Sequence, residues 1–317
     1  MVTIKTNSMS KPTQPVNRIV FFVLACCVAA WLATPLVAQE PTRPPITGIA
    51  HVRVYVTDLR KSTDFYSRML GLPMRSGGCT GMMRHCFILN DHQQVLLAEA
   101  PAARPANFLS EIAFATSDIN RMRAYLIAHN VAAGPISRDI NSVAYFSLHD
   151  PEGNNLAFVQ FHPLTGSVAP TGKLSGRMLH AGFIVKDRAA EDRFYRDLLG
   201  FRMYWHGGFK DSGDDWWEIQ VPDGSDWIEY MLNIPATADA KERGVQNHFS
   251  VGVEKIQSAV SQLHQNGVEK FDGPEIGRDG KWSLDVYDPD DTRVEVMEFT
   301  PAKDPCCHPY TADHPKP

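Results

Sequence analysis

Two histidines and two glutamates stand in segments that otherwise have the apolar pattern of β-strands. His180 and His248 each open such a segment, and Glu229 and Glu295 each have apolar neighbours on both sides. A carboxylate inside an apolar strand is costly to bury unless it is paired or bound to a metal. Imidazole and carboxylate groups together suit Zn²⁺, Ni²⁺, Co²⁺, Mn²⁺ or Fe²⁺. Taken singly, each residue also fits an ordinary role, as a hydrogen-bonded histidine or a solvated glutamate.

The elements that would position these residues are predicted by an internal repeat. At a constant offset, His51 corresponds to His180, and each opens an alternating apolar segment that ends at Asp58 or Asp187. A helical pattern follows in both places, with Phe-Tyr and Leu-Gly pairs at matching positions. A glycine closes each helix, as is common at helix C-termini.

A second repeat lies inside each half of the chain. The segment that begins at Glu111 parallels the one that begins at His248, and both units finish with an Asp-Pro turn, at Asp150 and Asp288, before a last strand. We therefore predict four copies of a strand–helix–strand–strand–strand unit, at residues 46–101, 107–163, 176–235 and 244–300. The units form two domains, 46–163 and 176–300, followed by a tail, 301–317.

These units resemble the modules of the vicinal oxygen chelate superfamily, also called the glyoxalase/bleomycin resistance/dioxygenase group. The resemblance covers nearly all of the chain from Gly48 to Pro301 and rests on the repeated Asp, Phe-Tyr and Leu-Gly signature and on the two Asp-Pro turns. It implies an α+β fold of four βαβββ modules in two pairs. Each pair would form a curved mixed sheet around a cavity.

The resemblance also implies where a metal would bind, because the family carries its ligands on the first and last strands of each module. In the C-terminal half all four places hold competent ligands, in an order that resembles glyoxalase I: His180, Glu229, His248 and Glu295. In the N-terminal half the matching places hold His51, an apolar residue near Val95 or Leu96, Glu111 and Ala157. We therefore expect the first half to be structural or to shape the ligand site. Glu298 is expected to face solvent.

The activity implied by the resemblance is that of a glyoxalase-like lyase or isomerase. It would move a proton next to a carbonyl group in a small substrate with two neighbouring oxygens, with Glu229 and Glu295 as catalytic bases. Glyoxalase I enzymes carry an arginine for glutathione where this chain has Ile184, which argues against lactoylglutathione as the substrate.

Two other functions remain open. An Fe²⁺ extradiol dioxygenase would use His180, His248 and Glu295, but residues 271–287 lack the additional histidine of that family. A non-catalytic ligand-binding protein, as in bleomycin resistance, would need no metal ligands. Several aromatic residues fall where the cavity is expected, either to stack a ring-shaped substrate or to fill the core: Tyr204, Trp205, Trp216, Trp217, Trp227 and Tyr230.

Composition restricts the partners. The formal net charge of −5 in 317 residues offers no basic excess for nucleic acid. Lys5, Lys11 and Arg18 precede an apolar stretch, 19–38, so residues 1–38 are predicted to be a signal peptide or an N-terminal anchor. The folded part would then be periplasmic or secreted, and would meet a membrane only through that segment. Monomer and homodimer are both compatible with four modules in one chain.

Export makes the cysteines disulfide candidates. Cys79 and Cys86 flank a predicted hairpin turn and could pair. Cys306 and Cys307 are neighbours in the Pro-rich tail, close to His308. The tail is expected to be mobile and too poor in ordered ligands to hold a metal dependably.

Overall fold

The computed structural model describes residues 1–3, 42–75, 85–103, 105–139, 141–161 and 172–317. Residues 4–38 of the predicted signal or anchor segment, and Cys79, lie outside these residues. Within them, no helix is both long and apolar enough to span a membrane.

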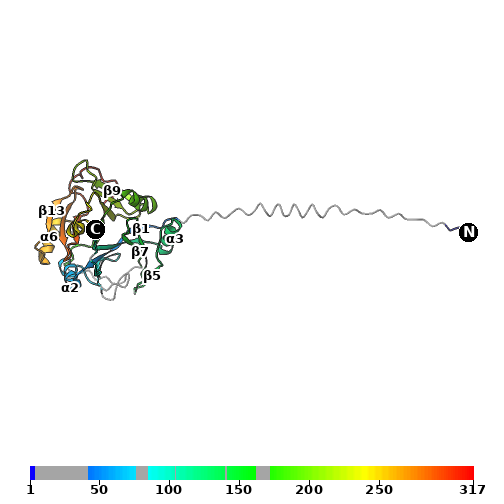
Figure 1. The fold of residues 1–317 in the computed structure, drawn as a ribbon, viewed down its shortest axis with the longest axis horizontal. Coiled ribbons are helices and arrows are strands. Elements are labelled where there is room, and N and C mark those ends of the chain that lie inside the picture. The colour runs from blue at the N-terminus through cyan, green and yellow to red at the C-terminus, as the bar shows by residue number, and fades with distance from the viewer. Residues whose placement is uncertain (4–41, 76–84, 104, 140, 162–171) are drawn as a thin grey trace. The chain divides into compact units, whose positions relative to one another are not determined.

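The first half of the folded part is a seven-stranded mixed sheet with the order β2-β3-β1-β4-β7-β6-β5. Strands β1, β5 and β7 of this sheet are labelled in Figure 1. Its strands are β1 (Ile46–Val56), β2 (His85–Asn90), β3 (Gln93–Glu99), β4 (Leu109–Thr116), β5 (Ser137–Arg138), β6 (Ala144–His149) and β7 (Asn155–Gln160). Its helices are α2 (Leu59–Asp64), continued by the π-helical turn η1 (Phe65–Met69), and α3 (Ile119–Ala128).

The second half is an eight-stranded mixed sheet with the order β13-β14-β15-β12-β8-β11-β10-β9. Its strands are β8 (Arg177–Ile184), β9 (Arg202–Gly207), β10 (Trp216–Gln220), β11 (Trp227–Met231), β12 (His248–Val253), β13 (Asp272–Ile276), β14 (Trp282–Tyr287) and β15 (Arg293–Glu298). Its helices are α4 (Arg188–Glu191), continued by η3 (Asp192–Leu198), then α5 (Ala240–Gln246) and α6 (Ile256–Gln265).

Both sheets are built in the same way. The first strands of the two modules pair antiparallel at the centre, β1 with β4 and β8 with β12. The last strand of each module then pairs parallel with its own first strand, β3 with β1, β7 with β4, β11 with β8 and β15 with β12. The predicted fold class is therefore confirmed. This strand order places the first and last strands of two modules side by side at the centre of each sheet.

The repeated sequence signature joins the two halves. Tyr66, on the helix of the first module, donates a hydrogen bond of 3.3 Å to Asp288, in the last turn of the fourth module. Tyr195, on the helix of the third module, donates an equivalent bond of 3.3 Å to Asp150, in the last turn of the second. Both tyrosines are fully buried. The Phe-Tyr and Asp-Pro motifs thus recur together because each tyrosine contacts the turn of the other half.

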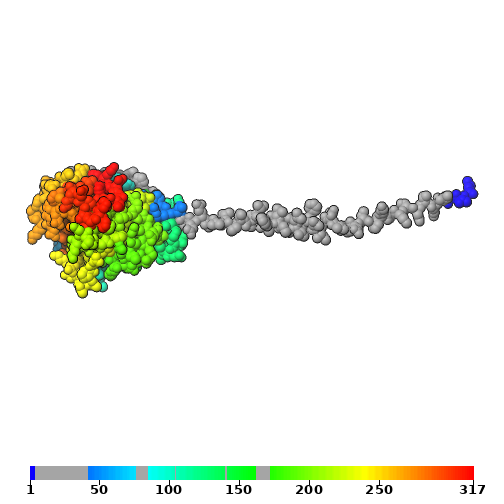
Figure 2. Space-filling model, turned by 90° about the horizontal axis from the view of Figure 1, so that it is seen from above, coloured from blue at the N-terminus to red at the C-terminus, as the bar shows by residue number. Residues whose placement is uncertain are grey.

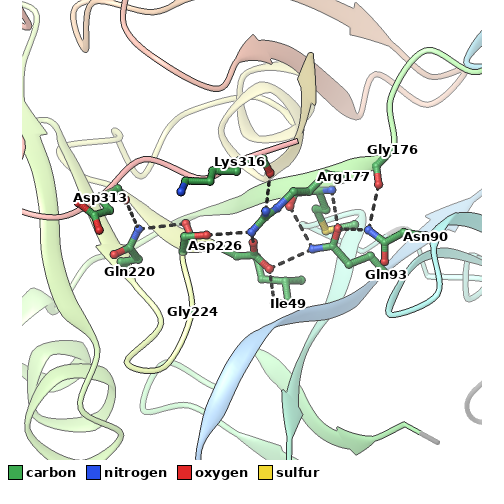
Figure 3. A network of polar contacts seen from close by, with 12 residues as sticks. Ile49, Asn90, Gln93, Gly176, Arg177, Gln220, Gly224, Asp226, Asp313 and Lys316 are labelled. Atoms are coloured by element: carbon green, nitrogen blue, oxygen red, sulfur yellow. Dashed lines mark hydrogen bonds and ion pairs between the residues drawn. The ribbon is translucent and has the colours of Figure 1, made fainter. Parts of the chain in front are cut away.

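A polar network completes the contact between the halves (Figure 3). The buried carboxylate of Asp226 accepts hydrogen bonds from Arg177, at 2.9 Å, and from the backbone N–H of Ile49 and the amide of Gln93 in the first half, at 2.9 and 3.0 Å. Arg177 also donates to the carbonyl oxygen of Lys316, at 2.5 Å. One buried carboxylate therefore connects both sheets to the end of the chain.

The tail differs from the expectation of a mobile segment, because residues 301–317 pack against the second sheet (Figure 2). Tyr310 packs on Tyr204 with ring centroids 4.7 Å apart, and the hydroxyl of Tyr204 lies 2.6 Å from Nδ1 of His314. Cys306 and Cys307 form a disulfide with each other. Aromatic residues in the tail thus cover an apolar part of the sheet that would otherwise meet water.

Candidate metal centre

The four predicted ligands lie on four adjacent strands, in the order β15, β12, β8 and β11. His180 is level with Ser250 on β12, which in turn is level with Glu295 on β15. Two residues further along β8, Gly182 is level with both His248 and Glu229. Because side chains alternate between the faces of a sheet, positions two apart share one face. All four ligands therefore point to the same side of the sheet.

The ligand atoms converge on one point. The two Nε2 atoms of His180 and His248 lie 3.0 Å apart. Oε2 of Glu229 lies 3.2 Å from Nε2 of His248 and 3.6 Å from Nε2 of His180. Oε2 of Glu295 lies 3.3 Å from Nε2 of His180 and 3.8 Å from Nε2 of His248. Metal–ligand bonds of about 2.1 Å place neighbouring ligand atoms roughly 3.0–3.4 Å apart, so this spacing suits a divalent transition metal.

The protonation of His248 also fits a metal ligand. Its Nδ1 lies 3.1 Å from the carbonyl oxygen of Gln246, which can only accept, so Nδ1 carries the proton and Nε2 presents a lone pair to the site. Burial and the charge of Arg293 lower the pKa of His248 to about 4, so the ring is neutral at physiological pH. Gly182 leaves the space that the ring needs, since a Cβ there would lie 2.2 Å from it.

Both glutamates are held in the ionised form. Burial alone would raise the pKa of Glu295, but the hydrogen bond to His180 and the charge of Arg293 bring it down to about 2. For Glu229, the effect of burial is likewise outweighed by the neighbouring imidazoles of His248 and His180, so its pKa is lowered. Even without Glu229, three ligand atoms lie within 4.8 Å of one another, those of His180, His248 and Glu295.

The sequence prediction missed Arg293. Its half-buried guanidinium donates a hydrogen bond of 2.8 Å to Nε2 of His248 and lies 3.4 Å from Asp285. Nε2 can serve either the guanidinium or a metal, so metal binding would free an N–H group of Arg293 for another acceptor. A signal was present in the sequence, because Arg293 stands two residues before Glu295 and therefore shares its face of the strand.

A cavity of about 420 Å³ opens beside the ligands and is lined by Glu229, Glu295 and Arg293. Of the six aromatic residues expected there, Trp205 and Trp216 line it. Tyr204, Trp227 and Tyr230 are fully buried packing residues. Trp217 is half-buried, with the guanidinium of Arg188 4.0 Å from its ring. The aromatic set therefore divides between cavity wall and core.

Lys281 is a buried cation behind this wall. Its ammonium lies 4.3 Å from the ring of Trp227 and 5.2 Å from that of Tyr310 in the tail. It partly offsets the charge of Glu218, whose pKa is nevertheless raised well above its ordinary value by burial.

The prediction that Glu298 faces solvent is wrong. It is buried, and its carboxylate accepts a hydrogen bond of 2.9 Å from the backbone N–H of Ile256. It therefore caps the start of α6, where Lys255 supplies no side-chain cap.

The matching positions of the first half hold an ion pair. Nε2 of His51 lies 3.0 Å from Glu111, and Arg53 reaches the other oxygen of the same carboxylate at 2.7 Å. The strand register puts Leu96 and Ala157 where the second half has its two glutamates. The guanidinium of Arg53 therefore neutralises Glu111 in this half. Leu96 and Ala157 cannot bind a metal, so two of the four ligand positions are missing.

The family comparison matches both halves. A model described as "Glyoxalase/Bleomycin resistance protein/Dioxygenase superfamily" matches residues 48–158 and 177–296. A search of curated proteins finds no significant match.

Solved structures with the same fold include two dioxygenases. A substrate complex of homoprotocatechuate 2,3-dioxygenase from Brevibacterium fuscum, with 3,4-dihydroxyphenylacetate, is 18% identical with a TM-score of 0.60, over 86% of this chain and 84% of that one. The 2,3-dioxygenase LapB from Pseudomonas sp. KL28 is 16% identical with a TM-score of 0.61, over 87% of this chain and 96% of that one. At these identities the likeness establishes the fold.

Proposed function

Because the chain belongs to the glyoxalase/bleomycin resistance protein/dioxygenase superfamily, we propose that it is a divalent-metal-dependent lyase or isomerase. Its substrate is a small molecule with two neighbouring oxygens, and the reaction moves a proton next to a carbonyl group. The observation that carries this proposal is the position of Glu229. Its carboxylate lies within 3.6 Å of both imidazole Nε2 atoms, beside a triad of ligands that can hold a metal without it.

The ligands are His180, His248 and Glu295, with Glu229 as fourth ligand and base. When bound, a divalent metal would polarise a carbonyl oxygen and stabilise negative charge on it. Glu229 lines the cavity, so its carboxylate can take a proton from a carbon next to that carbonyl and return it to the neighbouring carbon. Glu295, which lies 3.3 Å from His180 and is kept ionised in part by the charge of Arg293, acts chiefly as a fixed ligand. Arg293 faces the same cavity and stabilises charge on a substrate oxygen.

The test is hydrogen exchange in D₂O. The full chain, loaded with Zn²⁺, Ni²⁺, Co²⁺, Mn²⁺ or Fe²⁺, is incubated with 2-hydroxyketones and with thiol adducts of 2-oxoaldehydes, and NMR follows deuterium entering the carbon next to the carbonyl. Exchange should occur in the wild type and be lost in Glu229→Gln, which should keep its metal through the three remaining ligands. Exchange that survives this substitution would remove Glu229 from the mechanism.

A second candidate is an Fe²⁺ extradiol dioxygenase, which the triad of His180, His248 and Glu295 favours. It predicts oxygen uptake with catechols by the Fe²⁺-loaded chain and no deuterium exchange. A chain that binds none of these metals would instead be a ligand-binding protein.

Export is part of the proposal and rests on the basic and apolar pattern of residues 1–38. Cell fractionation and N-terminal sequencing of the mature protein test it. A new terminus near residue 39 in a periplasmic or secreted fraction indicates a cleaved signal, whereas an intact membrane-bound chain indicates an anchor.

A further inference from the structure

The cavity beside the candidate metal centre carries more negative than positive side chains. Two guanidinium groups line it, those of Arg278 and Arg293. Six carboxylates line it: Glu218, Glu229, Glu275, Asp279, Asp285 and Glu295. A divalent metal would neutralise only two of these carboxylates, those of its proposed ligands Glu229 and Glu295.

Strand register accounts for part of this crowding. Glu218 on β10 is directly opposite Glu229 on β11, and Asp285 on β14 is directly opposite Glu295 on β15. Like charges directly opposite each other destabilise a sheet. Moreover, Oε2 of Glu218 and Oδ1 of Asp285 are buried and have no hydrogen-bond partner among the described residues. Each ligand glutamate therefore has a second carboxylate beside it whose hydrogen bonding is incomplete.

The cationic side chains in and near the cavity do not neutralise all of the remaining carboxylates. Arg293 pairs with Asp285, and Arg278 pairs with Asp211, which is not in the cavity lining. The single ammonium of Lys281 lies near both Glu218 and Asp279 and lowers the pKa of each.

The exposed side chain of Glu275 makes no ion pair or hydrogen bond in the part of the chain that the structure describes. It is therefore left without a counter-charge, even when a divalent metal is counted.

The wall also offers exposed aromatic surface. Phe209 is 75% exposed, and its ring centroid lies 4.6 Å from that of Trp216. Both line the cavity together with Trp205. An exposed aromatic pair beside an unneutralised carboxylate is suited to a flat ring that carries an ammonium group.

We propose that the substrate of this site is positively charged. It is an aromatic compound with an ammonium side chain, and its two neighbouring oxygens reach the metal held by the four ligand residues. Carboxylate-bearing analogues are rejected because they would add to the uncompensated negative charge. This inference rests on the proposed function, since it assumes that paired oxygens bind at the metal.

The test uses three catechols that present the same pair of oxygens but differ in charge: dopamine, 4-methylcatechol and 3,4-dihydroxyphenylacetate. The full chain is loaded with Zn²⁺, which does not oxidise them, and dissociation constants are measured by calorimetry. We expect dopamine to bind at least about tenfold more tightly than 3,4-dihydroxyphenylacetate, with the neutral catechol between them. Added salt should narrow this ratio.

Two variants test whether the preference for dopamine arises from the cavity wall. Glu275→Gln should reduce the preference for dopamine severalfold, because it removes an uncompensated charge from the wall. Glu269→Gln, an exposed glutamate outside the cavity lining, is the matched control and should leave the preference unchanged.

The outcomes separate this inference from the proposed function. If 4-methylcatechol binds and 3,4-dihydroxyphenylacetate binds as tightly as dopamine or more tightly, the charge preference is refuted while chelation at the metal stands. If the Zn²⁺-loaded chain binds none of the three, paired-oxygen binding itself fails, and the inference fails with it.

Discussion

Nε2 of His180 lies 3.0 Å from Nε2 of His248, although 68 residues separate them in the sequence. The pair comes from antiparallel strands at the centre of the second sheet, β8 and β12, and each imidazole also faces two carboxylates. Imidazoles crowded against ionised carboxylates are best satisfied by a shared cation.

Removing a ligand should remove the metal. His180→Ala and Glu295→Ala should each reduce the metal content from about one ion per chain to nearly none, because each removes a member of the triad of His180, His248 and Glu295, whose ligand atoms all lie within 4.8 Å of one another. Elemental analysis by plasma mass spectrometry measures this. The matched control is His51→Gln in the first half, which keeps a partner for Glu111 and should leave the metal content unchanged. Loss of metal in that variant would reveal a second site.

Arg293 should matter for turnover more than for metal binding. Arg293→Met should lower kcat about 100-fold, as expected when a group that stabilises transition-state charge is lost, while the metal stays bound. Arg278→Met is the comparison, since that guanidinium also lines the cavity but pairs with Asp211, and its effect should be much smaller. Equal losses in both variants would argue that Arg293 has no specific role.

The tyrosine contacts between the halves should contribute to stability. Tyr66→Phe removes the hydrogen bond to Asp288 and should lower the free energy of unfolding by about 1 kcal/mol, and Tyr195→Phe should do the same through Asp150. Denaturant unfolding measures both. Tyr145→Phe, a half-buried tyrosine on β6, is the control and should change stability by less than about 0.5 kcal/mol. A change as large in the control would leave the two contacts without a special role.

Glu191 should make stability depend on pH. Burial raises its pKa from 4.5 to about 8, so the unfolded chain releases this proton at lower pH than the folded one does. Its contribution is therefore complete below about pH 4.5 and is lost as the pH rises towards 8.

The variant that tests this is Glu191→Gln, which cannot ionise but keeps the oxygen that accepts from the N–H of Glu152. Its unfolding temperature should fall less between pH 5 and pH 9 than that of the wild type. Glu254→Gln, at an exposed position, should behave like the wild type. Parallel curves for all three proteins would contradict the assignment.

The modules and the residue types of the site could be predicted from the sequence. The offset that relates His51 to His180 and the paired Asp-Pro turns define the units, because each module must repeat its own apolar periodicity to form the same strands and helix. Side chains in a strand alternate between faces, so matching positions in matching strands share a face. The candidates His180, Glu229, His248 and Glu295 follow from the resemblance to the superfamily, which carries its ligands on the first and last strands of each module.

The tertiary structure decided what surrounds those residues. Which strand lies beside which is set by packing of whole modules, so the sequence could not place Glu218 opposite Glu229 or Asp285 opposite Glu295. The tail was expected to be mobile because its composition is poor in regular structure, yet Tyr310 finds an apolar surface on the sheet. Local pattern determines the strands and their faces, whereas burial, charge balance and contacts between distant segments exist only once the modules have assembled.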